Sequence, residues 1–235
     1  MNKKIWFGSS LVLLGAVLMG LAFFQDGFPG QIYWNNGPVY LSERDEKGEV
    51  DLTPDQIVSG KQDLTGLDLS VKNADVTVRS GEHFAISVDR AEKNYVTVSS
   101  NDGLVKVTGD ERFGWSWGIN QPTPHHITIT LPEKTTLQSL SLASLNGDLT
   151  VKNSRSDQLK IKNTNGDVNL SDVKVATSGG VTNRYGDIFV KKSTLPKLKT
   201  YSRYGDINVT NAYQNVTADQ AVFSLTNLSG DISLT

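Results

Sequence analysis

Leu140-Ser-Leu-Ala-Ser-Leu-Asn-Gly-Asp-Leu-Thr-Val151 is the stretch that decides the fold, because aliphatic residues alternate with small or polar ones on both sides of a Gly-Asp pair. The pattern occurs five times, and its Asp residues are 19, 20, 19 and 25 positions apart. A period of two predicts β-strands, and a recurring Gly-Asp pair predicts a turn between two short strands. The pairs are Gly147-Asp148, Gly166-Asp167, Gly186-Asp187, Gly205-Asp206 and Gly230-Asp231.

The residues around each pair follow one rule. The first and third residues after every Asp are aliphatic, and the sixth and eighth residues before it are mostly apolar. Two short strands cannot bury an apolar side alone, but units stacked about 4.8 Å apart pair each strand with its copy and form a continuous core. The sequence therefore predicts an all-β fold, a β-solenoid of the right-handed parallel β-helix type. An antiparallel sandwich would not require the same turn in register five times.

The turn residues have a structural interpretation and two functional alternatives. Glycine suits a corner that needs a positive φ or close backbone packing. Asp suits a turn by accepting backbone N–H bonds, although a stacked row of carboxylates could also bind calcium or supply catalytic groups. The structural role is favoured, since the Gly-Asp spacing departs from that of calcium-binding repeats. The fourth residue before each Asp is small and polar, and is expected to hydrogen-bond along the stack: Ser144, Asn163, Asn183, Ser202 and Asn227.

The N-terminus predicts a membrane anchor. Lys3 and Lys4 precede an uncharged run of 20 residues from Ile5 to Phe24, which is the length of a transmembrane helix. The positive-inside rule places residues 1–24 with their N-terminal tip in the cytoplasm and the remainder of the chain outside. A cleaved signal peptide is the alternative, although its apolar region is usually shorter.

The rest of the chain divides into two expected parts. Residues 25–60 contain Pro, Gly and charged residues without a lasting period, so they predict an extracellular spacer. Residues 61–235 alternate with the period of strands and predict the repetitive β-helix domain.

Composition excludes several classes of protein. The chain has no cysteine, which excludes disulfides, thiolate metal sites and cysteine nucleophiles. A net charge of −2 gives no indication of nucleic-acid binding. The charge is uneven, since residues 25–139 carry 10 Lys and Arg against 17 Asp and Glu, whereas residues 140–235 carry 11 against 8.

Two groups of residues are candidates for binding. Trp115 and Trp117 stand in a Gly-punctuated segment, where they could stack on a sugar or partner, or could cover the end of the solenoid. Arg184, Lys192 and Arg203 belong to basic residues that recur in the Gly-Asp units and could contact an anionic wall polymer, although an ordinary solvated face is the favoured interpretation. No metal site or cofactor is predicted, because the adjacent His125 and His126 would face opposite sides of a strand.

The stretch His126-Ile-Thr-Ile-Thr-Leu-Pro132, with the Gly-Asp units that follow it, resembles a family of bacterial "putative adhesin" domains of unknown function. This family includes LiaG-like membrane-anchored proteins and is similar to the head-GIN adhesins. The resemblance covers residues 64–235 and implies an exported β-helical domain, often behind one transmembrane helix, that is tied to adhesion or envelope-stress sensing. It supplies no catalytic residues.

The combined expectation is a non-catalytic cell-surface binding or scaffolding module in the cytoplasmic membrane. Its expected partners are the membrane, through residues 5–24, and an envelope glycan, an anionic wall polymer or a membrane protein. Self-association is expected at the strand edge formed by the last unit. The alternatives are an envelope-stress sensory or regulatory accessory protein and a polysaccharide-degrading β-helix enzyme.

Overall fold

The computed structural model describes residues 32–34, 38–40, 49–54, 63–89, 96–109, 125–196, 198–211 and 224–235. The chain forms two units, one of residues 1–46 with 112–122 and the other of residues 47–111 with 123–235. In the first unit, β1 (Ile32–Trp34) pairs with β2 (Pro38–Tyr40) as an antiparallel hairpin. The second unit contains the repeat.

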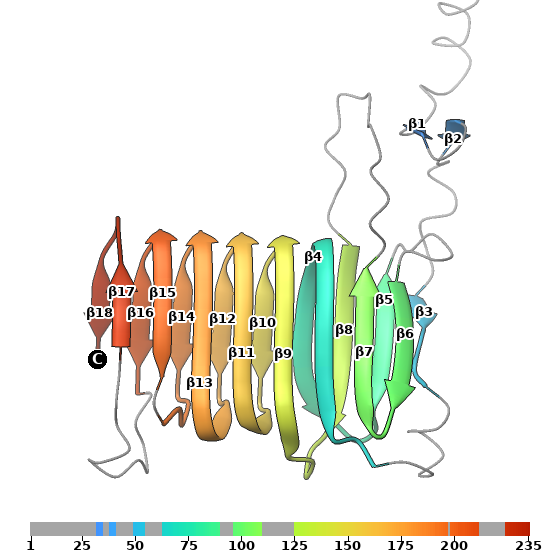
Figure 1. The fold of residues 1–235 in the computed structure, drawn as a ribbon, viewed down its shortest axis with the longest axis horizontal. Coiled ribbons are helices and arrows are strands. Elements are labelled where there is room, and N and C mark those ends of the chain that lie inside the picture. Colours follow the sequence, from blue (N-terminus) through green and yellow to red (C-terminus); the bar gives the residue numbers. More distant parts are fainter. Residues whose placement is uncertain are drawn as a thin grey trace, which may run out of the picture. The chain divides into compact units, whose positions relative to one another are not determined.

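Every regular element in the described part of the second unit is a β-strand. Together these strands form one continuous array of 16 strands, which Figure 1 shows side by side. They are β3 (Glu49–Asp51), β4 (Gly66–Gly81), β5 (Ala85–Asp89), β6 (Val96–Asn101), β7 (Leu104–Gly109), β8 (His125–Pro132), β9 (Leu137–Asn146), β10 (Leu149–Lys152), β11 (Arg155–Asn165), β12 (Val168–Ser171), β13 (Lys174–Tyr185), β14 (Ile188–Lys191), β15 (Lys199–Tyr204), β16 (Ile207–Thr210), β17 (Ser224–Asn227) and β18 (Ile232–Leu234).

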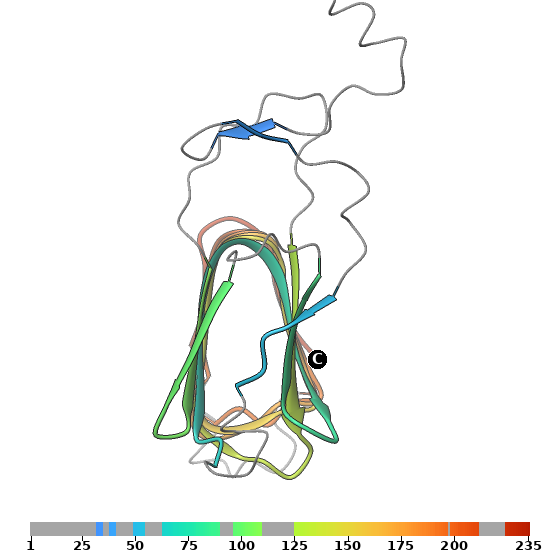
Figure 2. The same cartoon turned by 90° about the vertical axis from the view of Figure 1, so that its right-hand side faces the viewer.

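The array folds over itself into two facing halves, seen end-on in Figure 2, which we call the first and the second sheet. The first sheet contains β6, β7, the first half of β4, β9, β11, β13, β15 and β17, and the second contains β3, β5, β8, the second half of β4, β10, β12, β14, β16 and β18. From β9 onward each coil supplies one strand to each sheet and pairs in parallel with the coils beside it. The predicted β-solenoid is therefore confirmed.

The core lies between the two sheets and consists of the residues that the repeat predicts to point inward. Leu149, Val168, Ile188 and Ile207, which directly follow the Asp residues, are all fully buried. In the last described coil the equivalent Ile232 is 43% exposed, because β18 pairs with β16 alone among the described strands. The side chains of successive coils thus form columns, as stacking in register requires.

The N-terminal end of the second unit departs from a regular helix of coils. The strands β5 and β6 each pair antiparallel with a neighbour, and β3 pairs antiparallel with β5. The strand β3 comes from residues that were predicted to belong to the spacer. Parallel pairing begins with β7 and β8, which pair with the first and the second half of β4. The strand β4 then lies between β7 and β9 in the first sheet and between β8 and β10 in the second.

No helix in the described ranges is long and apolar enough to cross a membrane, and the predicted anchor at residues 5–24 lies outside those ranges.

Two corners join the sheets. At the Gly-Asp corner all five glycines have φ between +115° and +136°, a region that is accessible mainly to glycine. At the opposite corner four residues that are not glycine have φ between +48° and +55°, namely Asn153, Asp172, Lys192 and Asn211. Asn and Asp tolerate this left-handed conformation better than most residues, so the sequence does carry a signal for the second corner.

Steric contact leaves no room for a Cβ atom at the five corner glycines. A Cβ atom on Gly186 would lie 2.3 Å from the carbonyl oxygen of Gly166 in the preceding coil. A Cβ atom on Gly166 would likewise lie 2.4 Å from the carbonyl oxygen of Gly147, and one on Gly205 would lie 2.1 Å from that of Gly186. By contrast, Gly180 in the middle of β13 has ordinary space, since its nearest neighbour would be the carbonyl oxygen of Leu159 at 4.0 Å.

We expect Gly186→Ala to lower the free energy of unfolding by more than about 3 kcal/mol, because it combines a forbidden φ with a backbone clash. Gly180→Ala is the matched control in the same strand. It should leave stability unchanged or raise it by up to about 1 kcal/mol. Denaturant unfolding followed by circular dichroism measures both, and equal stability of the two variants would contradict the assigned corner.

Candidate functional site

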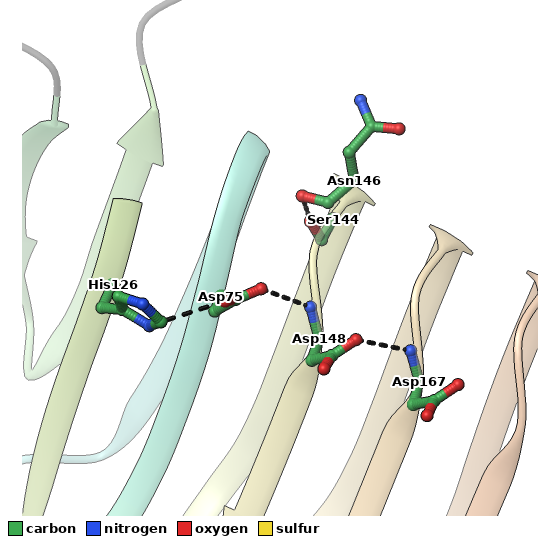
Figure 3. A network of polar contacts seen from close by, with 6 residues as sticks. All are labelled: Asp75, His126, Ser144, Asn146, Asp148 and Asp167. Carbon is green, nitrogen blue, oxygen red and sulfur yellow. Dashed lines mark hydrogen bonds and ion pairs between the residues drawn. The ribbon is translucent and has the colours of Figure 1, made fainter. Parts of the chain in front are cut away.

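The Asp residues of the Gly-Asp corner form a hydrogen-bonded ladder between coils. The backbone N–H of Asp148 donates to Oδ1 of Asp75, and that of Asp167 donates to Oδ1 of Asp148, each at 2.8 Å (Figure 3). The same bond, again at 2.8 Å, joins Asp187 to Asp167, Asp206 to Asp187 and Asp231 to Asp206. Each carboxylate therefore fixes the amide of the next coil, which is a charge-assisted bond.

The ladder begins one unit earlier than the five pairs indicate. Asp75 belongs to a sixth unit, in which Ala74 replaces the glycine and Leu67 and Leu69 occupy the inward positions. The signal for this unit is Asn73-Ala-Asp-Val76-Thr-Val78, which matches the later units except at the glycine. On the other side of Asp75, its Oδ2 lies 3.5 Å from Nδ1 of His126 on β8.

A second column of polar side chains lies inside the corner. The Nδ2 atom of Asn163 donates to the carbonyl oxygens of Gly147 and Gly166, both at 3.1 Å. Asn183 donates in the same way to Gly166 O at 2.8 Å, and Asn227 to Gly205 O at 2.8 Å. The expected bonds along the stack are therefore made by the asparagines. They are not made by the serines, since Ser144 Oγ donates to Asn146 O in its own coil at 3.2 Å and Ser202 Oγ is buried without a hydrogen-bond partner among the described residues.

A third column faces solvent, two residues before each Asp. In the early coils it is a ladder of amides, in which Asn165 donates to Oδ1 of Asn146 at 2.7 Å and Asn146 donates to Oδ1 of Asn73 at 2.6 Å. In the next two coils the column continues with Tyr185 and Tyr204. Their rings stack with centroids 5.2 Å apart and planes 8° apart, and they are 40% and 44% exposed.

An arginine precedes each of these tyrosines. The guanidinium of Arg184 lies 5.2 Å from the ring centroid of Tyr185, and that of Arg203 lies 5.4 Å from that of Tyr204. Both distances are within the range of cation–π contacts. The signal is the tetrapeptide Arg-Tyr-Gly-Asp, which occurs at 184–187 and 203–206, although only its basic residues were predicted to bind. We call Arg184, Tyr185, Arg203 and Tyr204 the Arg-Tyr platform.

The structure separates the predicted binding residues. Arg184 and Arg203 are neighbours on β13 and β15, since Asn183 pairs with Ser202 and Tyr185 with Tyr204. Lys192 is exposed at the opposite corner, at the far end of β14. Trp115 and Trp117 lie outside the described residues. Within the described ranges no group of three or more His, Asp or Glu side chains converges to hold a metal ion.

We expect Asp187→Ala to lower the free energy of unfolding by about 1–3 kcal/mol, because the amide of Asp206 loses its acceptor. Asp187→Asn is the matched control, since its amide oxygen can still accept that bond, and it should cost less. Thermal melting of both variants tests the ladder. If the alanine variant melts like the wild-type protein, the carboxylate is not a structural acceptor.

The chain is similar to several solved crystal structures, among them the following three. A "putative cell adhesion protein" from Clostridium sporogenes is 12% identical with a TM-score of 0.45, over 80% of this chain and 95% of that chain. A "putative adhesin" from Bacteroides fragilis is 11% identical with a TM-score of 0.34, over 73% and 92%. A "putative lipid binding protein" from Parabacteroides distasonis is 12% identical with a TM-score of 0.27, over 80% and 96%.

No curated protein sequence matches the chain. The model of one family does match, over residues 64–235, which are the sixth unit, the five Gly-Asp units and the strands between them. The family resemblance expected from the repeat is thereby confirmed. The chain belongs to the Toastrack DUF4097 family.

Proposed function

We propose that this protein is a non-catalytic binding module of the bacterial cell envelope, anchored in the cytoplasmic membrane by residues 5–24 with its repeat domain outside. The observation that carries the proposal is the Arg-Tyr platform. It places two exposed aromatic rings and two guanidinium groups side by side on adjacent coils. Tyrosine and arginine are among the residues that most often dominate the energy of a binding surface.

The backbone beneath the platform favours binding. Both tyrosines directly precede corner glycines, and their carbonyl groups are fixed by the neighbouring coil, since Gly166 N donates to Tyr185 O and Gly186 N to Tyr204 O, each at 3.0 Å. The rings are stacked before any ligand arrives. A ligand would therefore lose little conformational entropy in ordering this surface, which is the advantage of a preorganised site.

The ladder carboxylates support a structural role over an enzymatic one. From Asp75 to Asp206, each Oδ1 already accepts the amide of the next coil. These bonds give each carboxylate a structural task in the turn, which is the role that Asp commonly has there. Incubation with envelope polysaccharide should therefore generate no new reducing ends.

Several parts of the proposal rest on the sequence alone. The anchor rests on the uncharged run from Ile5 to Phe24 behind Lys3 and Lys4. The right-handed winding of the coils, contact with a membrane protein and self-association at the C-terminal edge stay predictions.

Binding can be tested by sedimenting the full chain, in detergent micelles, with washed envelopes of the cells that produce it. We expect the double variant Tyr185→Ser, Tyr204→Ser to bind about tenfold more weakly or worse, because it removes both aromatic contacts. Phe189→Ser is the control, since Phe189 is 36% exposed on β14 of the second sheet. Equal binding by wild type and double variant would exclude the platform as the contact surface, and no binding by the wild type would refute the proposed function.

The proposed topology predicts that protease added to intact, wall-stripped cells removes the domain beyond residue 60 and leaves the anchor in the membrane. Immunodetection of a tag at each end of the chain measures this. Protection of the C-terminal tag in intact cells, with digestion after lysis, would contradict the extracellular placement.

A further inference from the structure

The outer surface of the first sheet carries a second feature, a group of cations on three adjacent strands. Side chains on β11, β13 and β15 point alternately into the core and outward. Beyond the bulge near the start of β11, five of the outward residues are basic, and we call them the cationic face: Lys160, Lys162, Arg184, Lys199 and Arg203. The first four are exposed, and Arg203 is half-buried. Arg155 and Lys174 are also exposed, but they come before the bulge.

The strand register arranges these cations in rows. Lys160 pairs with Gly180, and Gly180 pairs with Lys199, so two ammonium groups flank a residue without a side chain. Adjacent strands are about 4.8 Å apart, which separates the Cα atoms of the two lysines by about 10 Å. Lys162 lies about 7 Å from Lys160 along β11, and Arg184 and Arg203 form another row near the Gly-Asp corner.

The positive charge is not balanced locally. Beyond the bulge near the start of β11, the other outward residues of these paired strands are Gln158, Thr164, Ser178, Gly180, Thr182 and Tyr201, none of which is acidic. The nearest acidic residue on β11 is Asp157, at the bulge itself. None of the five cations forms an ion pair with a carboxylate among the residues that the structure describes. Like charges on neighbouring strands repel, so the fold gains nothing from this arrangement by itself.

We propose that the cationic face binds a linear polymer that carries phosphate groups along its length. This inference rests on the proposed function and names its ligand class. Lysine binds phosphate as a point charge, and arginine can bind two phosphate oxygens at once. Repeated cations without intervening acids suit a repeated anion.

The layout favours a polymer over a small anion or a membrane. The cations spread across three strands and do not converge on one point, so a single phosphate could contact only a few of them. A protein that lies on a membrane normally combines basic residues with exposed apolar side chains. Among the described residues, the exposed large apolar side chains on these strands are Tyr185 and Tyr204, both at the corner.

The probe for this site is inorganic polyphosphate labelled with a fluorophore at one end. Fluorescence anisotropy would measure its affinity for the full chain in detergent micelles at several salt concentrations. We expect the triple variant Lys160→Gln, Lys162→Gln, Lys199→Gln to bind at least about tenfold more weakly. The slope of log affinity against log salt should also fall by about 0.7–0.9 for each lysine–phosphate pair that the substitutions remove.

The control variant removes the same number of positive charges from lysines outside the cationic face. In the triple variant Lys134→Gln, Lys152→Gln, Lys191→Gln, all three lysines are exposed, one in the turn before β9 and two on the second sheet. Its affinity should stay within about twofold of wild type. Equally weakened binding in the two triple variants would mean that polyphosphate responds to net charge alone, which would overturn the proposal.

A substitution at one position tests the arrangement of the cations and leaves all five basic residues unchanged. Gly180→Glu places a carboxylate between Lys160 and Lys199, where a Cβ atom fits without a close contact. It should weaken polyphosphate binding clearly more than Gly180→Gln, which adds the same bulk without charge. Melting curves confirm that both variants fold. Equal affinity of these two variants would also contradict the proposal.

Two further ligands decide the chemical class. If polygalacturonate binds more tightly than polyphosphate, the ligand is a polymer of carboxylates and not of phosphates. If phosphatidylglycerol vesicles bind in preference to polyphosphate, the ligand is a membrane surface and not a polymer. Either result overturns the proposal. If the chain sediments with envelopes but binds no polyphosphate, the binding module stands and only its ligand class is wrong.

Discussion

The close approach of consecutive coils at the Gly-Asp corner is the constraint on which the rest of the structure depends. The Cα of Gly186 is so near the preceding coil that a Cβ atom would lie 2.3 Å from the carbonyl oxygen of Gly166. Only this approach brings the amide of Asp187 within 2.8 Å of the carboxylate of Asp167. The corner thereby fixes the register of both sheets, and the register aligns the inward residues in columns that fill the core.

The same register places equivalent outward side chains of successive coils in rows on the surface. Two copies of Arg-Tyr-Gly-Asp become two stacked rings with two guanidinium groups, because equivalent residues of successive coils are strand neighbours. Lys160 and Lys199 come from different coils, yet they lie in one row on either side of Gly180. Binding surfaces on such a fold can change by substitution of outward residues alone, since the core and the ladder use other positions.

The sequence predicted the repeat well because its rules are local. Burial of Leu149, Val168, Ile188 and Ile207 follows from their place beside Asp. The sixth unit was missed because Ala74 replaces glycine and because 73 residues separate Asp75 from Asp148, so nothing local indicates that β4 lies beside β10. The stacking of Tyr185 on Tyr204 was missed for another reason. The alternation of apolar residues predicts which side chains point into the core, but it carries no information about contacts between the side chains that point outward. Lys192 was grouped with the arginines by charge, whereas the coil geometry puts it at the other corner.

Amide hydrogen exchange of the ladder tests the central claim most directly, because each Asp amide is held by a carboxylate of the coil before it. Measured by NMR, the amides of Asp167, Asp187 and Asp206 should exchange as slowly as that of the buried Ile188, through global unfolding only. Exchange of these three amides at the rate of an exposed turn residue such as Lys134 would contradict the account. The coils would then not be joined by the Asp ladder.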